Sequence, residues 1–196
     1  MKRIDIVFAA ALLLAASCAK EQIPSTSNEP KLVEKTFVAD AGMTKTSLAE
    51  GNKVVWTAGD KISVFDNVSK KNNPFESSSI NGNGACFTGY VAAEATEYVA
   101  VYPYRYGTSY DATNKKITTT YPIIQKAVKG SFDNNLNVSV AVSKGANLQF
   151  KNIGALLKVT IPGGLTNVRA ISLANESTRM SGKFVITLAE NGTFTV

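Results

Sequence analysis

Apolar residues recur along this chain in short runs, and no stretch repeats them with the 3.6-residue period of an amphipathic helix. The runs are rich in Val, Ile, Thr, Phe and Tyr and are separated by clusters of Gly, Asn, Asp and Pro, as is typical of strands joined by turns. Some runs alternate in the way of a half-buried strand, with Ile62 and Val64 on one face. The predicted strands are Leu32–Val38, Val54–Trp56, Lys61–Phe65, Ala85–Val91, Tyr98–Tyr102, Lys116–Tyr121, Val138–Val142, Leu148–Phe150, Ala155–Ile161, Val168–Leu173, Lys183–Leu188 and Thr193–Val196.

This pattern predicts an all-β fold, and strands with turns this frequent favour a β-sandwich over a barrel. Phe150 and the apolar run Ala155–Val159 are expected in the core, as a central strand covered on both faces. Asn191-Gly192 is the strongest hairpin signal, because both residues tolerate positive φ. The hairpin that it opens reaches the last residue, so we expect a chain that is cut short or that starts an incomplete second domain.

The first residues have the layout of an export signal. Lys2 and Arg3 precede an apolar run from Ile6 to Ala16, which is too short to span a bilayer as a helix. The segment Leu14-Ala15-Ala16-Ser17-Cys18 resembles a bacterial lipobox, which implies cleavage before Cys18 and acylation of its thiol. Residues 1–17 are therefore predicted to be a lipoprotein signal peptide, with Cys18 as the lipid anchor.

A second interpretation of the leader stays open. An ordinary secretory signal cut at a nearby alanine would leave Cys18 as a free thiol or as a disulfide partner of Cys86, the other cysteine of the chain. The residues after the cysteine, Ala19-Lys20-Glu21-Gln22, look like the tag that follows the lipidated cysteine in surface lipoproteins of Bacteroides-type bacteria. They favour an exposed position at the outer membrane.

The segment that follows is expected to be a flexible tether. Residues 18–30 are polar and carry two prolines, a composition that cannot bury enough apolar surface to fold. The remaining residues, 31–196, are predicted to form the β-sandwich domain, and the apolar fraction of 44% with 18% charged residues suits a globular protein.

Composition also narrows the chemistry. The net charge of +6 comes mainly from scattered lysines, without the clustered basic face that a nucleic acid would favour. The chain has no histidine, so it lacks the commonest general base and the commonest nitrogen ligand for metals. No carboxylate pair stands out from the expected turn residues Asp60, Asp66, Asp111 and Asp133. We therefore expect no enzyme, no metal site and no cofactor.

Several stretches together resemble the fimbrillin-like lipoproteins of Bacteroides and related bacteria, the family of pilus subunits and related surface proteins. They span most of the chain after the leader and occur in the family's order: Lys45–Leu48, Val54–Phe65 (VVWTAGDKISVF), Tyr98–Tyr104 (YVAVYPY), Gln125–Ala127, Gly130–Asp133 and Leu148–Val159 (LQFKNIGALLKV). The resemblance implies a transthyretin-like β-sandwich, export as a lipoprotein and assembly in which a neighbouring subunit adds a strand.

The resemblance also implies a role. Shaft subunits of the family are cut after an arginine, but no arginine lies between Cys18 and Arg105. This departure favours an anchor or accessory subunit that keeps its lipid, a non-catalytic surface protein with structural or adhesive duty in fimbriae.

A surface lipoprotein that binds glycans is the alternative. Stacked aromatic rings hold sugars, and Trp56, Tyr102, Tyr104 and Tyr106 are the candidate platform. The simpler interpretation is that these aromatic rings pack half-buried where a strand leaves the core through Pro103. Other subunits, a glycan or a host surface are thus the expected partners.

Overall fold

The computed structural model describes residues 29–39, 47–49, 53–81, 84–126, 128–129, 131–133, 136–189 and 193–196. The predicted signal peptide, Cys18 and nearly all of the predicted tether lie outside these residues. The described residues form the strands β1 (Leu32–Ala39), β2 (Ser47–Ala49), β3 (Lys53–Val55), β4 (Lys61–Asp66), β5 (Asn73–Asn81), β6 (Gly84–Ala92), β7 (Tyr98–Tyr102), β8 (Ser109–Asp111), β9 (Lys116–Tyr121), β10 (Ser139–Ser143), β11 (Asn147–Leu148), β12 (Lys151–Asn152), β13 (Gly182–Leu188) and β14 (Phe194–Thr195).

The first sheet has eight strands in the order β11-β1-β6-β5-β4-β7-β10-β12. Its neighbours are antiparallel except for β1 and β11, and β1 pairs with β6 over its whole length. Side chains from strands across the sheet meet in one interior cluster, which requires the sheet to curl. We call this the first core cluster: Phe37, Ala39, Trp56, Ile62, Val64, Phe75, Ala85, Phe87, Val91, Tyr98, Ala100, Tyr102, Ala141, Leu148 and Phe150.

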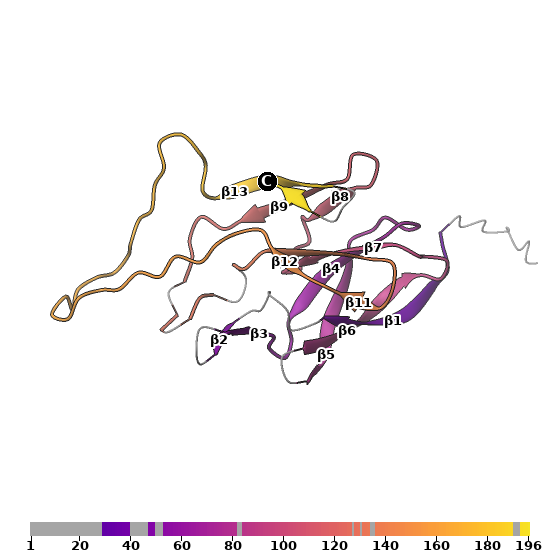
Figure 1. The fold of residues 1–196 in the computed structure, drawn as a ribbon, viewed down its shortest axis with the longest axis horizontal. Coiled ribbons are helices and arrows are strands. Elements are labelled where there is room, and N and C mark those ends of the chain that lie inside the picture. Colours follow the sequence, from indigo (N-terminus) through magenta and orange to yellow (C-terminus); the bar gives the residue numbers. More distant parts are fainter. Residues whose placement is uncertain are drawn as a thin grey trace, which may run out of the picture.

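The second sheet has four strands in the order β14-β13-β9-β8 and lies over β4, β7 and β12 (Figure 1). Between the two sheets is the second core cluster, which consists of Phe65, Val99, Val101, Ile117, Val138, Val140, Ile186 and Leu188. Strand β7 contributes alternate residues to both clusters, so all five of its residues are buried. That burial on both faces explains why β7 has an almost continuous apolar sequence.

The predicted all-β, sandwich-type fold is confirmed, and most predicted strands are present within a residue or two. The prediction missed β2, β5, β8 and β12. Strand β5 has the largely polar sequence NPFESSSIN, and Phe75 is the one residue of it that is fully buried. Pairing with β4 and β6 on its two edges makes it a strand, which a hydrophobic pattern does not reveal.

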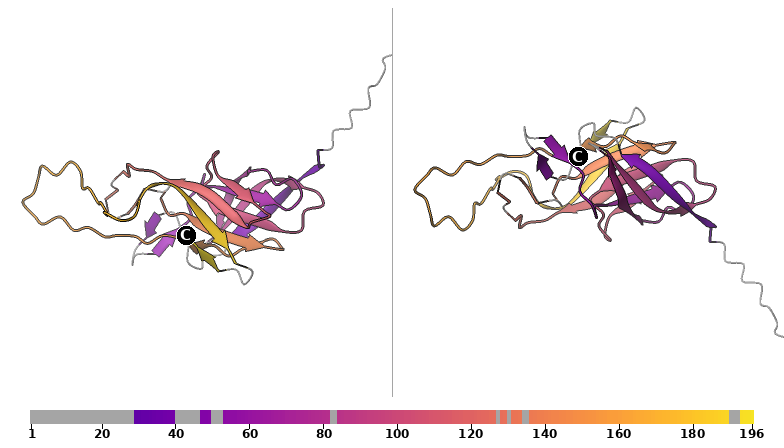
Figure 2. Two further views of the ribbon diagram at one scale, coloured as in Figure 1. Left: turned by 90° about the horizontal axis from the view of Figure 1, so that it is seen from above. Right: turned by 90° about the horizontal axis from the view of Figure 1, so that it is seen from below.

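Two predicted strands are wrong. Ala155–Ile161 and Val168–Leu173 are exposed coil without sheet partners, so the run Ala155–Val159 is not a central core strand. Phe150, by contrast, is buried as predicted. We call residues 154–181 the arm; it extends away from the two sheets as a long loop (Figures 1 and 2).

The hairpin expected near the C-terminus is present. Strand β13 pairs antiparallel with β14 through Thr187 with Thr195 and Leu188 with Phe194. The turn residues Asn191 and Gly192 themselves lie outside the described residues.

Candidate functional site

The predicted aromatic platform does not form a surface. Trp56 and Tyr102 are only 3% and 2% exposed, within the first core cluster. The Trp56 ring meets Phe87, Tyr102 and Phe150 edge-on, with ring centroids 5.0, 5.3 and 5.5 Å away. Such edge-to-face packing is typical of a core. The expectation that Trp56 and Tyr102 stack on a ligand is therefore wrong, because the faces of both rings are already covered by protein.

The other two platform residues lie apart from this cluster. Tyr104 is partly buried, and its backbone N–H donates to the Lys61 carbonyl at 2.7 Å. Tyr106 is 92% exposed. Strand β7 ends at Tyr102, so the spacing of two residues no longer places these tyrosines on one face of a strand. Two of the four aromatic residues are thus in the core, Tyr104 is partly buried and Tyr106 is in solvent.

The conspicuous sequence Trp-Thr-Ala-Gly-Asp forms a tight turn before β4. The Asp60 carboxylate accepts the Thr57 N–H at 2.7 Å, and Gly59 has a φ of +84° that favours glycine. Ser77 holds the turn from β5: its hydroxyl accepts the Gly59 N–H and donates to the Thr57 carbonyl. Asp60 is therefore a turn carboxylate, as its sequence context predicted. Beside it is a polar groove of about 310 Å³ bounded by the turn and by Tyr102–Tyr104.

A larger groove of about 360 Å³ lies between the two sheets. Its apolar walls come from the second core cluster and its neighbours: Phe65, Val99, Tyr110, Val142 and Leu188. The rings of Tyr110 and Phe65 are tilted against each other with centroids 5.9 Å apart, and burial raises the pKa of the Tyr110 phenol. We call this the intersheet groove; it combines an aromatic wall with a polar rim.

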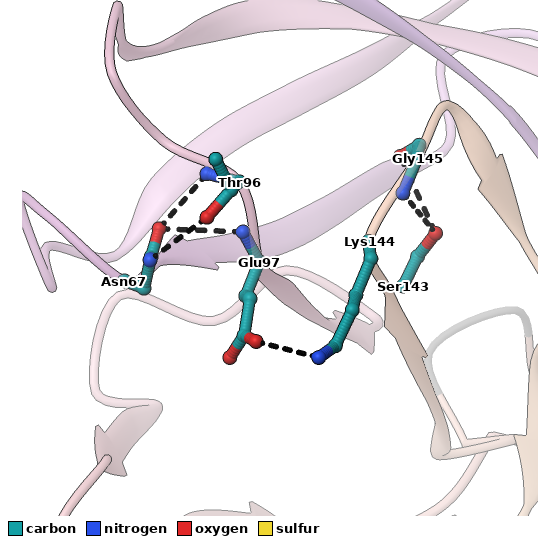
Figure 3. Close-up of polar contacts among 6 residues, drawn as sticks. All are labelled: Asn67, Thr96, Glu97, Ser143, Lys144 and Gly145. Atoms are coloured by element: carbon teal, nitrogen blue, oxygen red, sulfur yellow. Dashed lines mark hydrogen bonds and ion pairs between the residues drawn. The ribbon is translucent and has the colours of Figure 1, made fainter.

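The polar rim is formed by Asn67, Glu97, Lys115 and Lys144. Figure 3 shows how two loops are fixed there: the Asn67 side-chain oxygen accepts the backbone N–H groups of Thr96 and Glu97, at 3.0 and 3.3 Å. The Asn67 amide nitrogen in turn donates to the Thr96 hydroxyl. Glu97 forms an ion pair with Lys144 at 2.9 Å. At the rim, hydrogen bonds therefore join two segments of the chain, and an ion pair joins a third segment to them.

Asp66 also lines this groove, directly before Asn67 in the chain, and is 2% exposed. Burial alone would raise the pKa of its carboxyl, but hydrogen bonds from Ser69, from the backbone N–H of Val68 and from that of Ala92 together lower it. Asp111 is likewise a turn carboxylate, since it accepts the N–H groups of Thr113 and Asn114. Asp60 and Asp66 stand at opposite ends of β4, so they do not form a catalytic pair.

The residues that the structure describes contain no group of three or more Cys, Asp or Glu side chains placed to hold a metal ion. The same part of the chain contains no helix long and apolar enough to cross a membrane.

Comparison with protein-family models, with curated proteins and with solved structures yields no significant match to this chain.

Sequence reasoning missed the intersheet groove for a structural reason. Its lining comes from the ends of β4, β7, β8, β10 and β13 and from the loops between them, so no local motif marks it. The one local signal was Tyr110, an aromatic residue in a polar strand between Ser109 and Asp111.

Proposed function

We propose that this protein is a non-catalytic surface lipoprotein, a fimbrillin-like structural or adhesive component of pili that serves as an anchor or accessory subunit. Cys18 would hold it at the outer membrane by a lipid. The leader and the ordered sequence stretches support the export and family parts of the proposal, and the all-β fold is compatible with them.

The observation that carries the assembly part is the open edge of β1. Strand β11 covers only Val38 and Ala39, and no other described strand pairs with Leu32–Phe37 on that side. Alternate backbone N–H and C=O groups along this edge therefore have no strand partner among the described residues. Leu32 and Val33 beside them are 51% and 37% exposed. An open edge flanked by apolar side chains suits the addition of a strand from another subunit.

The first test is surface labelling of native cells with a protease and an antibody, in wild type and in Cys18→Ala, with electron microscopy of antibody-decorated cells. The proposal expects a surface signal that is lost in Cys18→Ala and decoration of filaments in wild type. A surface signal unaffected by Cys18→Ala would overturn the lipid anchor. A surface signal without filaments would overturn the pilus assignment and favour the alternative.

The alternative is a surface lipoprotein that binds glycans, and the intersheet groove supports it. An aromatic wall with amide, carboxylate and ammonium groups at the rim is the chemistry that sugars need, and the volume of about 360 Å³ suits a small ligand. The test is to pass the Tyr110→Ala variant over immobilised polysaccharide and to measure how much of it is retained. Tyr106→Ala, which changes an exposed tyrosine outside the groove, is the control. Loss in the first variant alone supports glycan binding, and equal retention of both contradicts it.

A further inference from the structure

The two ends of the arm both lie beside Tyr121. Its last residue precedes Gly182, which pairs with Tyr121 across β13 and β9. Its first residue, Gly154, lies so close to the same tyrosine that an added Cβ would be 2.6 Å from the Tyr121 hydroxyl oxygen. Between these points, 27 residues from 155 to 181 form no described strand.

The arm nevertheless has the sequence of a β-hairpin. In an extended chain Leu157, Val159 and Ile161 would share one face, as would Ile171 and Leu173. Gly163-Gly164 form a turn between the two halves, and Gly164 has a φ of +96°. The two halves together would give one apolar face, yet Leu157, Ile171 and Leu173 are 57% to 68% exposed in the structure.

An open strand edge lies beside the root of the arm. Strand β13 pairs with β9 on one side, but β14 covers only Thr187 and Leu188 on the other. The segment Gly182–Ile186 therefore has no described strand on that side. The core below this edge is also incomplete: Phe184 stacks on Tyr121 with ring centroids 4.8 Å apart, and both rings are only partly buried at the margin of the second core cluster.

We propose that the arm segment Ile171–Ala174 docks on this open edge of β13 in the same chain, as an antiparallel strand. The register that matches apolar faces places Leu173 beside Phe184 and Ile171 beside Ile186. Ser172 then faces outward beside Val185, which is 43% exposed. Ala155–Ile161 then pairs with the docked segment as a further strand. The second sheet thus gains two strands, which cover the margin of the second core cluster.

The connection between the two strands favours the same chain over a second copy. Only residues 175–181 join Ala174 to Gly182, a length typical of loops between antiparallel neighbours. This loop already contains a bend, because the Asn175 side-chain oxygen accepts the N–H groups of Ser177 and Thr178, at 2.9 and 3.2 Å. Gly182 has a φ of +100°, which helps the chain to turn into β13. So short a connection gives an effective concentration on the order of millimolar, above that of a dilute second molecule.

The proposal is tested by disulfide trapping in the full chain, with Cys18→Ser and Cys86→Ser to remove the native thiols. The pair Ser172→Cys with Val185→Cys is opposite in the proposed register, where antiparallel neighbours approach closely enough for a disulfide. Leu165→Cys with Val185→Cys is the control, because residue 165 lies in the turn. We expect the first pair to oxidise roughly tenfold faster than the control and to give a monomer on a non-reducing gel. A cross-linked dimer would show that a second copy is the occupant and would overturn the proposal, as would equal rates for the two pairs.

Hydrogen exchange provides a test without cysteines. We expect the amides of Gly182–Ile186 that point away from β9, and the amides of Ile171–Ala174 that face β13, to exchange at least about tenfold more slowly than those of the Gly163-Gly164 turn. Ile171→Pro should abolish the protection of these amides and leave β4, β7 and the amides of β13 that face β9 protected, since proline removes a donor and cannot continue the ladder. Fast exchange of these amides in the wild type would overturn the proposal, and so would protection of the same amides that survives in Ile171→Pro. Neither result bears on Cys18 or on filaments, so this proposal can fail independently of the proposed function.

Discussion

The two sheets and the arm have similar apolar sequences and different structures. In β7 the sequence YVAVY is buried at every position, whereas ALLKVTI in the arm is exposed throughout. The difference lies in the neighbours: β7 is paired with β4 and β10 on its two edges and covered by a core cluster on each face. The arm has no described strand beside it. An apolar alternating run thus indicates that a segment can form a strand, and a partner decides whether it does.

Two leucine truncations should show the largest difference between these regions. Leu148 is fully buried in the first core cluster, and Leu165 in the turn of the arm is 60% exposed. Leu148→Ala should lower the free energy of unfolding by about 2–5 kcal/mol, because it leaves a cavity. Leu165→Ala should change it by less than about 0.5 kcal/mol. Urea unfolding measures both, and equal losses would mean that the arm turn is packed as tightly as the core.

A glycine pair tests how tightly the first sheet itself is packed. A Cβ at Gly89 would lie 2.6 Å from the Phe75 ring and 2.8 Å from the Pro74 carbonyl oxygen. Gly89→Ala should therefore cost about 1–3 kcal/mol of unfolding free energy. At Gly107, an added Cβ meets no atom within 4 Å, so Gly107→Ala is the matched control and should be close to neutral. A neutral Gly89→Ala in thermal unfolding would show that strands β5 and β6 can separate easily.

The buried carboxylate of Asp66 should make the free energy of unfolding depend on pH. Its pKa is lower in the folded protein than in the unfolded chain, so its ionised form stabilises the fold above the unfolded value near 3.9. That contribution, about 1 kcal/mol, should be lost as the pH falls through the lower folded pKa. Denaturant titrations between neutral and acid pH should thus show a shallower decline for Asp66→Asn than for wild type.

The control for this titration is Asp111→Asn. Asp111 also has a lowered pKa, through its hydrogen bonds with Asn114, but it lies in an exposed turn. Asp111→Asn should change the pH dependence of the unfolding free energy less than Asp66→Asn does. A larger effect at Asp111 would contradict the assignment of the buried carboxylate as the main acid-sensitive group of the pair.

The smallest effect is expected at the rim of the intersheet groove. Glu97 and Lys144 form an ion pair at 2.9 Å, but both side chains are more than half exposed. Glu97→Gln should cost less than about 1 kcal/mol, and salt should reduce the loss further. Thermal unfolding at low and high ionic strength measures it, with Lys144→Gln as the reciprocal variant. A large loss that persists in high salt would mean that the pair holds the groove more firmly than its exposure indicates.

The candidate sites were predicted unevenly. The turn role of Asp60 followed from local sequence, because a carboxylate after Ala-Gly can accept an N–H group of its own turn. The aromatic platform could not be judged in the same way. Trp56 and Tyr102 are far apart in sequence and become buried only when β4, β6 and β7 assemble, and nothing in their spacing shows on which side of the sheet they lie.

The sequence by itself determined that this protein is all-β, where most of its strands run and where turns interrupt them. Those properties are local: alternation, β-branched residues and residues that tolerate positive φ act within a few positions. Only the tertiary structure decided that a polar segment such as β5 is a strand, that Trp56 is core and that the arm is exposed. These outcomes depend on backbone groups and apolar surfaces brought together from distant parts of the chain, and they follow from pairing and burial that no local pattern contains.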